Sequence, residues 1–221
     1  MIYRYVYGIL RNNLSKTKFF WKYRHLLDSS VWQGYRESYK SSRRLFYFEL
    51  IKQYNLTSVF EFGCASGPNF YSIKSKKPDI IFFGYDISRS AIQQVNYKKK
   101  KEVEFTHKLS SQLIKDFLNR NNIKKFDLVI FDRVLYMLNE KTLKLFLNEY
   151  SIFFKYVIIE DFHSEKEKWD SDKYIYAKNY IKIFSEYDFH LMQNKKSLMP
   201  SKSAEKFARR ILFSIEKNET I

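Results

Sequence analysis

The chain has 221 residues, 45% of them hydrophobic, with one cysteine and a formal net charge of +16. This length and apolar content suit one domain with additions and exclude wholesale disorder, and the single cysteine, Cys64, excludes a disulfide framework or a cysteine-based metal site. No apolar run reaches the ~18 residues that a membrane-spanning helix needs, and no signal peptide with a plausible cleavage site is evident, so we expect a cytoplasmic protein.

The positive charge raises the question of a nucleic-acid partner. However, the lysines are scattered, and the one dense run, Lys98 to Lys101, is short. Lysine, isoleucine, asparagine, phenylalanine and tyrosine are plentiful while glycine and proline are scarce, which is typical of an AT-rich genome that fills solvated faces with lysine. Solvated lysines are therefore the favoured interpretation, and nucleic-acid binding is the alternative.

Residues 2–11 mix aromatic and apolar side chains with two arginines. This pattern favours a short amphipathic helix that packs on the domain, with weak peripheral membrane contact as the alternative. Residues 19–38 follow and are rich in tryptophan, tyrosine, arginine and histidine, which suit face stacking and bidentate hydrogen bonds to a polar ligand. Trp21 and Trp32 can equally be core anchors. Residues 41–54 predict a helix that leads into the first strand.

The most informative stretch starts with an apolar strand at residues 58–62, interrupted by Glu61. Small residues then allow a tight turn and close approach of a ligand to the backbone. They are Gly63, Ala65 and Gly67. Pro68 suits the first turn of a helix. Strand, small-residue loop and helix N-terminus together predict a nucleotide-type site with backbone N–H groups facing the ligand.

A second apolar strand, within residues 79–88, ends in Asp86, nineteen residues beyond Gly67. In doubly wound folds an acid at about this distance from the loop reaches ribose hydroxyls. The loop lacks the G-x-G-x-x-G of a dinucleotide site and the G-K-[ST] of a phosphate loop. An ordinary strand-to-helix turn, with Asp86 or Ser88 as N-cap, is the competing interpretation.

The acid-x-Gly-x-Ala-x-Gly loop and Asp86 together resemble the first two motifs of the class I S-adenosylmethionine (SAM)-dependent methyltransferases, with Ala65 as a mild departure. The resemblance covers roughly residues 55–217. It implies an α/β fold with a doubly wound, mostly parallel seven-stranded sheet and an antiparallel final hairpin strand. Residues 1–54 would form an N-terminal helical extension or lid, and residues 55–221 the cofactor domain. The implied cofactor is SAM, with Asp86 on its ribose and Ile87 on its adenine. The implied cofactor-binding residues are Glu61, Gly63, Ala65, Gly67, Asn69, Asp86, Ile87 and Asp132.

The remaining elements alternate as this fold requires. Ser88 should cap a helix that ends in the lysine run, and a third strand and a helix should follow at residues 103–106 and 111–118. Many family members carry an acid after the third strand, whereas residues 107–110 contain none. Further elements are predicted in chain order: a fourth strand and short helix at 126–138, a helix at 140–154, a fifth strand at 155–159, a charged loop at 164–173, a helix at 174–187, and final strands at 188–195 and 209–216 around a surface excursion at 198–207.

Methyl transfer needs an aligned acceptor, exclusion of water and, for a hydroxyl, removal of a proton. The candidate bases at the ends of the fourth and fifth strands are Asp132, Glu160 and His163, with Asp161 beside them. Each also has a structural interpretation, as a helix cap, a turn residue or a packed histidine. The predicted acceptor-binding residues are Trp21, Arg24, His25, Trp32, Tyr35, Arg133 and Tyr136, with Arg24 or Arg36 anchoring an anionic group.

Several chemistries are disfavoured on residue grounds. No N/D-P-P-Y/F/W run follows the fourth strand, as adenine or glutamine methylation would need. Cytosine C5 chemistry needs a nucleophilic cysteine, and Cys64 is better read as a small packing residue of the loop. Asp132, Glu160 and Asp161 only weakly mimic a metal site, so no metal is expected. We therefore predict O- or N-methylation of a small-molecule or sugar-linked acceptor. The alternatives are an RNA methyltransferase and a SAM-binding protein without catalysis.

Overall fold

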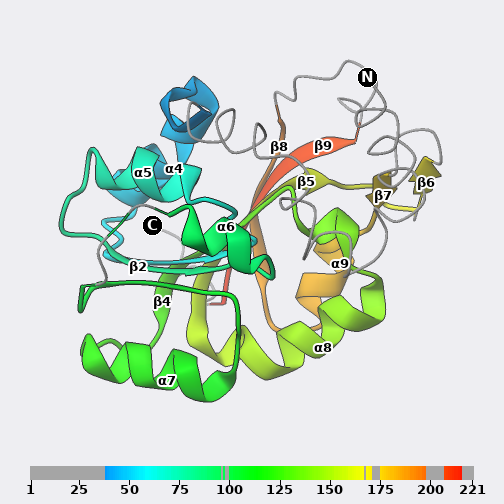
Figure 1. Ribbon diagram of the computed structural model, residues 1–221. Helices are drawn as coiled ribbons and strands as arrows, with labels where there is room; N and C mark the ends of the chain where they lie inside the picture. The colour runs from blue at the N-terminus through cyan, green and yellow to red at the C-terminus, as the bar shows by residue number, and fades with distance from the viewer. Residues whose placement is uncertain are drawn as a thin grey trace, which may run out of the picture.

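The computed structural model describes residues 38–95, 97, 100–166, 168–170, 175–197 and 207–215. Its main sheet has seven strands in the order β3-β2-β1-β4-β5-β9-β8 (Figure 1). The first five of these are parallel neighbours, whereas β9 runs antiparallel to both β5 and β8. The strands are β1 (Ser58–Phe62), β2 (Ile81–Tyr85), β3 (Val103–Thr106), β4 (Phe126–Asp132), β5 (Phe154–Phe162), β8 (His190–Lys196) and β9 (Ala208–Ser214). The predicted sheet, with its antiparallel final hairpin, is confirmed.

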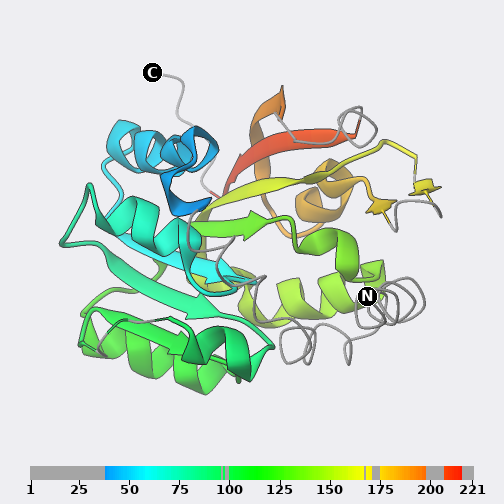
Figure 2. The same ribbon diagram turned by 45° about the horizontal axis from the view of Figure 1, so that its top comes forward.

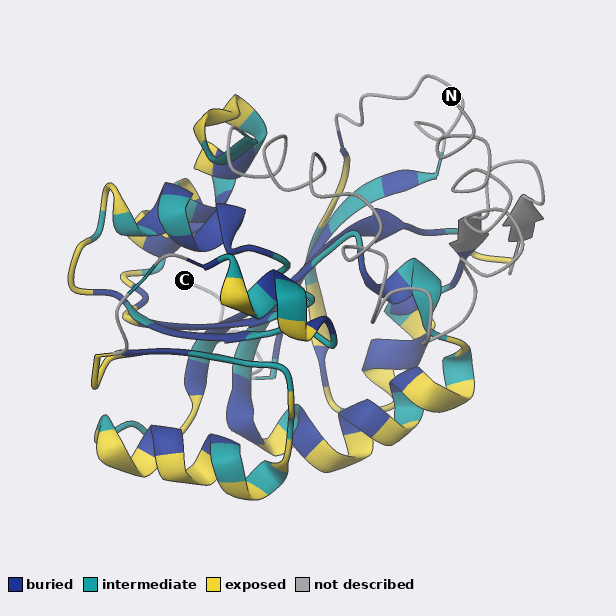
Figure 3. Ribbon diagram, in the orientation of Figure 1, coloured by how far each residue is buried: buried dark blue, intermediate teal, exposed yellow. Residues whose placement is uncertain are grey.

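Helices cover both faces of the sheet, and their exposed sides face outward in Figure 3. On one face α4 and α5 bury Tyr47, Leu50 and Phe70 against the strands. On the other face α7, α8 and α9 contribute apolar side chains such as Phe117 and Leu147. The helices are α4 (Ser42–Gln53), α5 (Pro68–Lys74), α6 (Arg89–Gln93), α7 (Ser111–Arg120), α8 (Glu140–Tyr150) and α9 (Tyr180–Ser185), with short 3₁₀ turns η2 (Ser38–Lys40), η3 (Leu135–Met137) and η4 (Ser151–Phe153).

The predicted helix before the first strand is present as α4, and it is part of the main core. Tyr47 and Ile51 are buried to 1% exposure and pack in the same cluster as Val59 of β1 and Ile130 of β4. Packing of the core therefore continues across position 54, the boundary predicted between the N-terminal extension and the cofactor domain.

The strand order places a switch point between β1 and β4. From β1 the chain moves outward through β2 and β3, then returns to the other side of β1 for β4 and β5. The arrowheads of the parallel strands point to the same side in Figure 2, so their carboxyl ends share one edge. In open α/β sheets ligands bind outside this edge at the switch point.

Four local predictions need correction. The helix after Ser88 ends at Gln93, before the lysine run. The fifth strand extends to Phe162, so Glu160 and Asp161 lie within it and are not turn residues. The charged loop contains a strand, β6 (Lys168–Asp170), that pairs antiparallel with β7 (Ile175–Ala177). The following helix starts only at Tyr180, because Asn179 accepts a hydrogen bond from the Lys182 N–H and caps it there.

Across the described ranges, no helix is both long enough and apolar enough to cross a membrane.

Candidate functional site

The small-residue loop after β1 is fixed by backbone hydrogen bonds to the end of β2. The N–H groups of Gly63 and Cys64 both donate to the Tyr85 carbonyl, at 2.7 and 2.9 Å. Gly63 has a φ of 78°, and a Cβ at this position would lie 2.6 Å from Cγ2 of Val134. Both the left-handed backbone and the close approach of Val134 therefore require glycine here. Cys64 is buried, and burial raises the pKa of its thiol well above the usual range, so it is a packing residue.

Asp86 anchors the middle of the same loop. One carboxylate oxygen accepts from the Ala65 N–H at 2.9 Å, and the other accepts from the Ser88 N–H at 2.8 Å. Ala65 is held at a φ of 50°, an uncommon conformation for a residue with a side chain. Burial raises the pKa of Asp86 to about 6. Each oxygen keeps a second lone pair, so the carboxylate can still accept hydrogen bonds from a ligand.

Glu61 lies at the end of β1 and is only 2% exposed. Its Oε1 accepts a 2.7 Å hydrogen bond from the side-chain amide of Asn69, at the start of α5. Its Oε2 is buried and has no hydrogen-bond partner among the described residues, and the same holds for Oγ of Ser66 in the loop. Burial raises the pKa of Glu61 to about 8. An unsatisfied buried carboxylate oxygen beside a nucleotide-type loop is suited to a cationic ligand group.

Three acids form a row on one face of the sheet. Glu61, Asp132 and Glu160 come from the adjacent strands β1, β4 and β5, and Asp132 is aligned directly with Glu160. Because side chains alternate along a strand, all three point to the face covered by α4 and α5. The residues two positions earlier, Val59, Ile130 and Ile158, belong to the core on that face.

Two arginines at the start of α4 bind the middle acid of this row. Arg43 makes a bidentate pair with Asp132, its two terminal nitrogens lying 2.9 and 3.1 Å from the carboxylate oxygens. Arg44 lies 3.2 Å from the same carboxylate and also donates to the side-chain oxygen of Asn69. Burial alone would raise the pKa of Asp132, but Arg43, Arg133 and Arg44 overcome this effect and lower it.

The third acid, Glu160, is fully buried and has several partners. Arg210 of β9 donates from Nε at 2.6 Å, Ser197 donates its hydroxyl, and Arg43 lies 3.6 Å away. The Arg210 guanidinium also stacks 3.6 Å from the centre of the Phe46 ring on α4. Both oxygens of Glu160 are thus occupied by protein groups. These pairings disfavour Asp132 and Glu160 as proton acceptors and favour a structural role for both.

The other predicted base, His163, is also engaged. Its Nδ1 accepts from the Tyr180 N–H at 3.3 Å, so the proton of the neutral ring resides on Nε2. Burial, together with the nearby Arg209, lowers its pKa. Asp161 points to the opposite face from Glu160 and accepts from the N–H groups of Leu135 and Tyr136 at the start of η3. No group of three potential metal ligands occurs in the described part of the chain.

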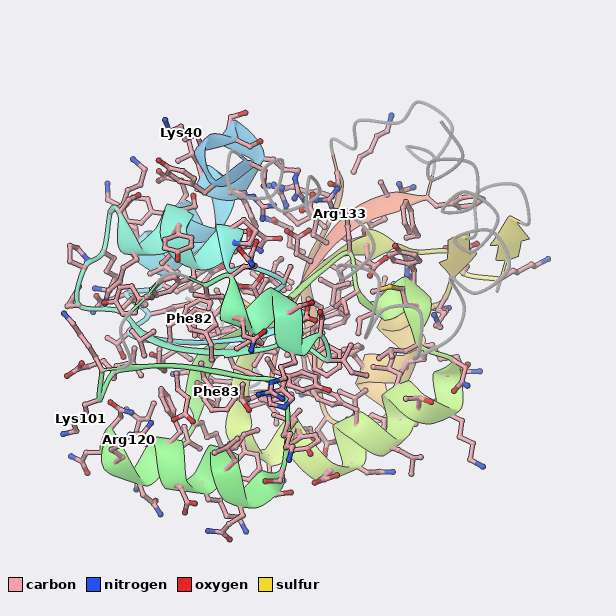
Figure 4. The ribbon with its side chains drawn as sticks, viewed as in Figure 1. Lys40, Phe82, Phe83, Lys101, Arg120 and Arg133 are labelled. Atoms are coloured by element: carbon pink, nitrogen blue, oxygen red, sulfur yellow. The ribbon has the colours of Figure 1, made fainter. Side chains whose placement is uncertain are left out.

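The predicted acceptor residues Arg133 and Tyr136 follow β4 at the switch point. Arg133 has a φ of 54°, and its N–H donates to the Glu160 carbonyl at 2.8 Å. Its Nε lies 3.3 Å from Asp132, and its side chain is 32% exposed. Tyr136 is partly exposed and packs edge-to-face on Phe162 at 5.3 Å. Figure 4 labels Arg133 between α4 and β9.

The remaining acceptor candidates lie outside the described residues. They are Trp21, Arg24, His25, Trp32 and Tyr35, together with Arg36 and the proposed membrane contact at residues 2–11. Their roles, like those of every predicted site residue, stay predictions.

The arginine pair on α4 was not predicted, although one signal was available. Arg44 lies three residues before Tyr47 and seven before Ile51, so it shares the buried face of the helix with them. A cation on the apolar face of a helix indicates a buried acidic partner elsewhere in the fold. Arg210 carried no such signal.

The described sheet, its helices and its loop define the fold of the class I SAM-dependent methyltransferases. Among solved structures, similarity extends to the plantazolicin methyltransferase BpumL in complex with SAH (TM-score 0.58, 13% identity, 97% of this chain and 99% of that chain). It also extends to human N-acetylserotonin methyltransferase in complex with SAM (TM-score 0.62, 14%, 96% and 61%) and to magnesium protoporphyrin IX methyltransferase from Synechocystis PCC 6803 with bound SAM (TM-score 0.51, 14%, 96% and 95%). No family model matches the chain, and no curated protein matches its sequence.

Proposed function

We propose that this protein is a SAM-dependent methyltransferase acting on a small-molecule or sugar-linked acceptor. The observation that carries the proposal is the pair of acids on either side of the small-residue loop. Glu61 has one buried oxygen with no partner in the described residues, and Asp86 keeps free lone pairs. The ammonium group of an amino acid needs a carboxylate oxygen without another partner, as in Glu61. The two hydroxyls of a ribose need a carboxylate that can still accept hydrogen bonds, as in Asp86.

The residues of the site would divide the work of binding. Glu61 would bind the cofactor ammonium, and Asp86 would accept hydrogen bonds from the ribose hydroxyls. Ile87, which is partly exposed beside Asp86, would cover one face of the adenine. When bound, SAM supplies a methyl group on a good leaving group, so the protein mainly has to orient the acceptor and exclude water.

Solved structures of the same fold support the proposal, because those of BpumL and the human and Synechocystis enzymes contain SAM or SAH. These enzymes are named for different acceptors, so the acceptor proposed here rests on this chain's residues. RNA methylation is the second candidate, and the net charge of +16 favours it. SAM binding without catalysis is the third.

Calorimetric titration with SAM and with NAD is the direct test. We expect SAM to bind with a 1:1 stoichiometry and NAD not to bind. Tight NAD binding without a SAM signal would contradict the proposal. Turnover of methyl-labelled SAM with a size-fractionated cell extract then separates the three candidates: label in small molecules, label in RNA, or no label despite SAM binding.

A further inference from the structure

Positive charge exceeds negative charge around Asp132 and Glu160, the acids of the row that lie on β4 and β5. Four guanidinium groups contact Asp132 or Glu160, and these are the only two carboxylates with which they form salt bridges in the described residues. The four are Arg43, Arg44, Arg133 and Arg210. Two carboxylates therefore face four cations. A partly buried excess of positive charge at a ligand-binding edge favours an anionic ligand.

Arg133 is the arginine of this group best placed to bind such a ligand. Only its Nε has an acceptor within the described residues, whereas Arg43 is bound at both terminal nitrogens. Its backbone is fixed by the bond to the Glu160 carbonyl and by a left-handed φ that few residues with side chains adopt. The next residue, Val134, packs against Gly63 of the cofactor loop. Arg133 thus directly precedes a residue that packs against the cofactor loop.

None of the predicted bases Asp132, Glu160 and His163 is free to accept a proton at this edge. Asp132 is ion-paired with a lowered pKa, and both oxygens of Glu160 accept from protein donors. His163 uses Nδ1 to accept from a backbone N–H. A hydroxyl acceptor must lose a proton during methyl transfer, whereas a carboxylate is already ionised at neutral pH.

We propose that the methyl acceptor is a carboxylate and that Arg133 binds it; this inference rests on the proposed methyl transfer. One carboxylate oxygen accepts a hydrogen bond from Arg133, a geometry for which a guanidinium is well suited. The other oxygen forms the new C–O bond to the methyl carbon as the C–S bond breaks. The electron pair of that bond goes to sulfur, so the sulfonium becomes a thioether. No proton is transferred, and the product is a methyl ester.

The product test uses the alkali lability of methyl esters. The full-length protein is incubated with methyl-labelled SAM and cell extract, and the product is treated with base. We expect the label to be released as volatile methanol. Label that stays non-volatile, as in an ether, an amine or a phosphodiester, would overturn the inference and leave the proposed methyltransferase function intact. Failure to form any labelled product would count against the proposed function and the ester alike.

The binding test does not depend on turnover. SAH-saturated protein is titrated with benzoate and with the neutral benzamide. We expect the wild type to prefer benzoate at least tenfold, and R133Q to lose that preference. R120Q is the matched control, because Arg120 on α7 forms its salt bridge with Glu104 and Figure 4 labels it far from Arg133. Equal binding of the two probes, or an unchanged preference in R133Q, would overturn the inference.

Arg133→Gly tests whether a loss of the benzoate preference could result from misfolding of the R133Q variant. Glycine adopts a φ of 54° without strain, so this variant should unfold at or above the wild-type temperature. We expect it to bind SAH within about threefold of the wild type and to lose the benzoate preference. A glycine variant that folds and keeps the preference would also refute the role of Arg133.

Discussion

Two pairs of carboxylates lie on the same edge of this sheet in opposite electrostatic surroundings. Glu61 and Asp86, beside the small-residue loop, interact with amide groups, and burial raises the pKa of each. Asp132 and Glu160, on the next two strands β4 and β5, are enclosed by arginines, and the pKa of Asp132 is lowered. The first pair has hydrogen-bonding capacity left for a ligand, and the second pair has its charge neutralised by the protein.

The comparison shows that an acid at the carboxyl end of a parallel strand is not by itself a candidate base. Its partners decide the role. Asn69 joins the two regions, because its amide nitrogen donates to Glu61 at 2.7 Å and to Asp132 at 3.1 Å.

The largest effect should come from Asp132→Ala. This change leaves Arg43 and Arg44 buried without their main carboxylate, which we expect to lower the free energy of unfolding by about 3–5 kcal/mol. Urea denaturation measures it. The control is Asp79→Ala, whose side chain is 76% exposed and which should change stability by less than about 0.5 kcal/mol. A loss below about 1 kcal/mol for Asp132→Ala would show that the arginines do not depend on this acid.

Asp86→Ala should weaken SAM binding by about 1–3 kcal/mol, measured by calorimetry, because ribose hydroxyls lose their acceptor and Ala65 loses its anchor. Asp79→Ala again serves as the control and should bind SAM normally. Wild-type SAM affinity in the Asp86 variant would remove the distinction between a ligand-binding pair and a structural pair.

Glu61→Gln should change how stability depends on pH. The folded protein holds a proton on Glu61 up to about pH 8, whereas the unfolded chain releases it near pH 4.5, so stability should fall as pH rises between these values. We expect the variant to lose this fall and therefore to be more stable than the wild type at pH 8. Thermal unfolding of both proteins at pH 5 and pH 8 measures it. Parallel pH profiles would mean that Glu61 is ionised in the free protein.

The smallest effect is expected for Ser88→Ala. The Ser88 hydroxyl caps α6 by accepting from the Ala91 N–H, and its loss should cost about 1 kcal/mol of stability. SAM affinity should change little, because Asp86 is held by the backbone N–H of Ser88 and not by its hydroxyl. Ser110→Ala removes the corresponding cap of α7 and is the matched control. A large loss of SAM affinity in Ser88→Ala alone would give the hydroxyl a direct role.

Contacts between residues close in sequence could be predicted from the sequence, whereas contacts between distant residues could not. The loop from Gly63 to Gly67 and its partner Asp86 are close in sequence, and backbone geometry fixes their residue types, so spacing alone predicted them. Arg43 contacts an acid 89 residues away, and Glu160 contacts Arg210 50 residues away. No local pattern encodes such pairs. The hairpin of β6 and β7 was missed because each strand has only three residues, too few to show an apolar alternation.

The span of the arginine network also sets an order for folding during synthesis. Arg43 and Arg44 leave the ribosome long before Asp132, and Glu160 acquires Arg210 only when the last strand of the sheet is made. At ordinary translation rates of about 5–20 residues per second, Glu160 on β5 waits about 3–10 seconds for Arg210 on β9. The nascent chain therefore carries charges without their partners throughout this interval, and the native edge of the sheet can close only after translation is nearly complete.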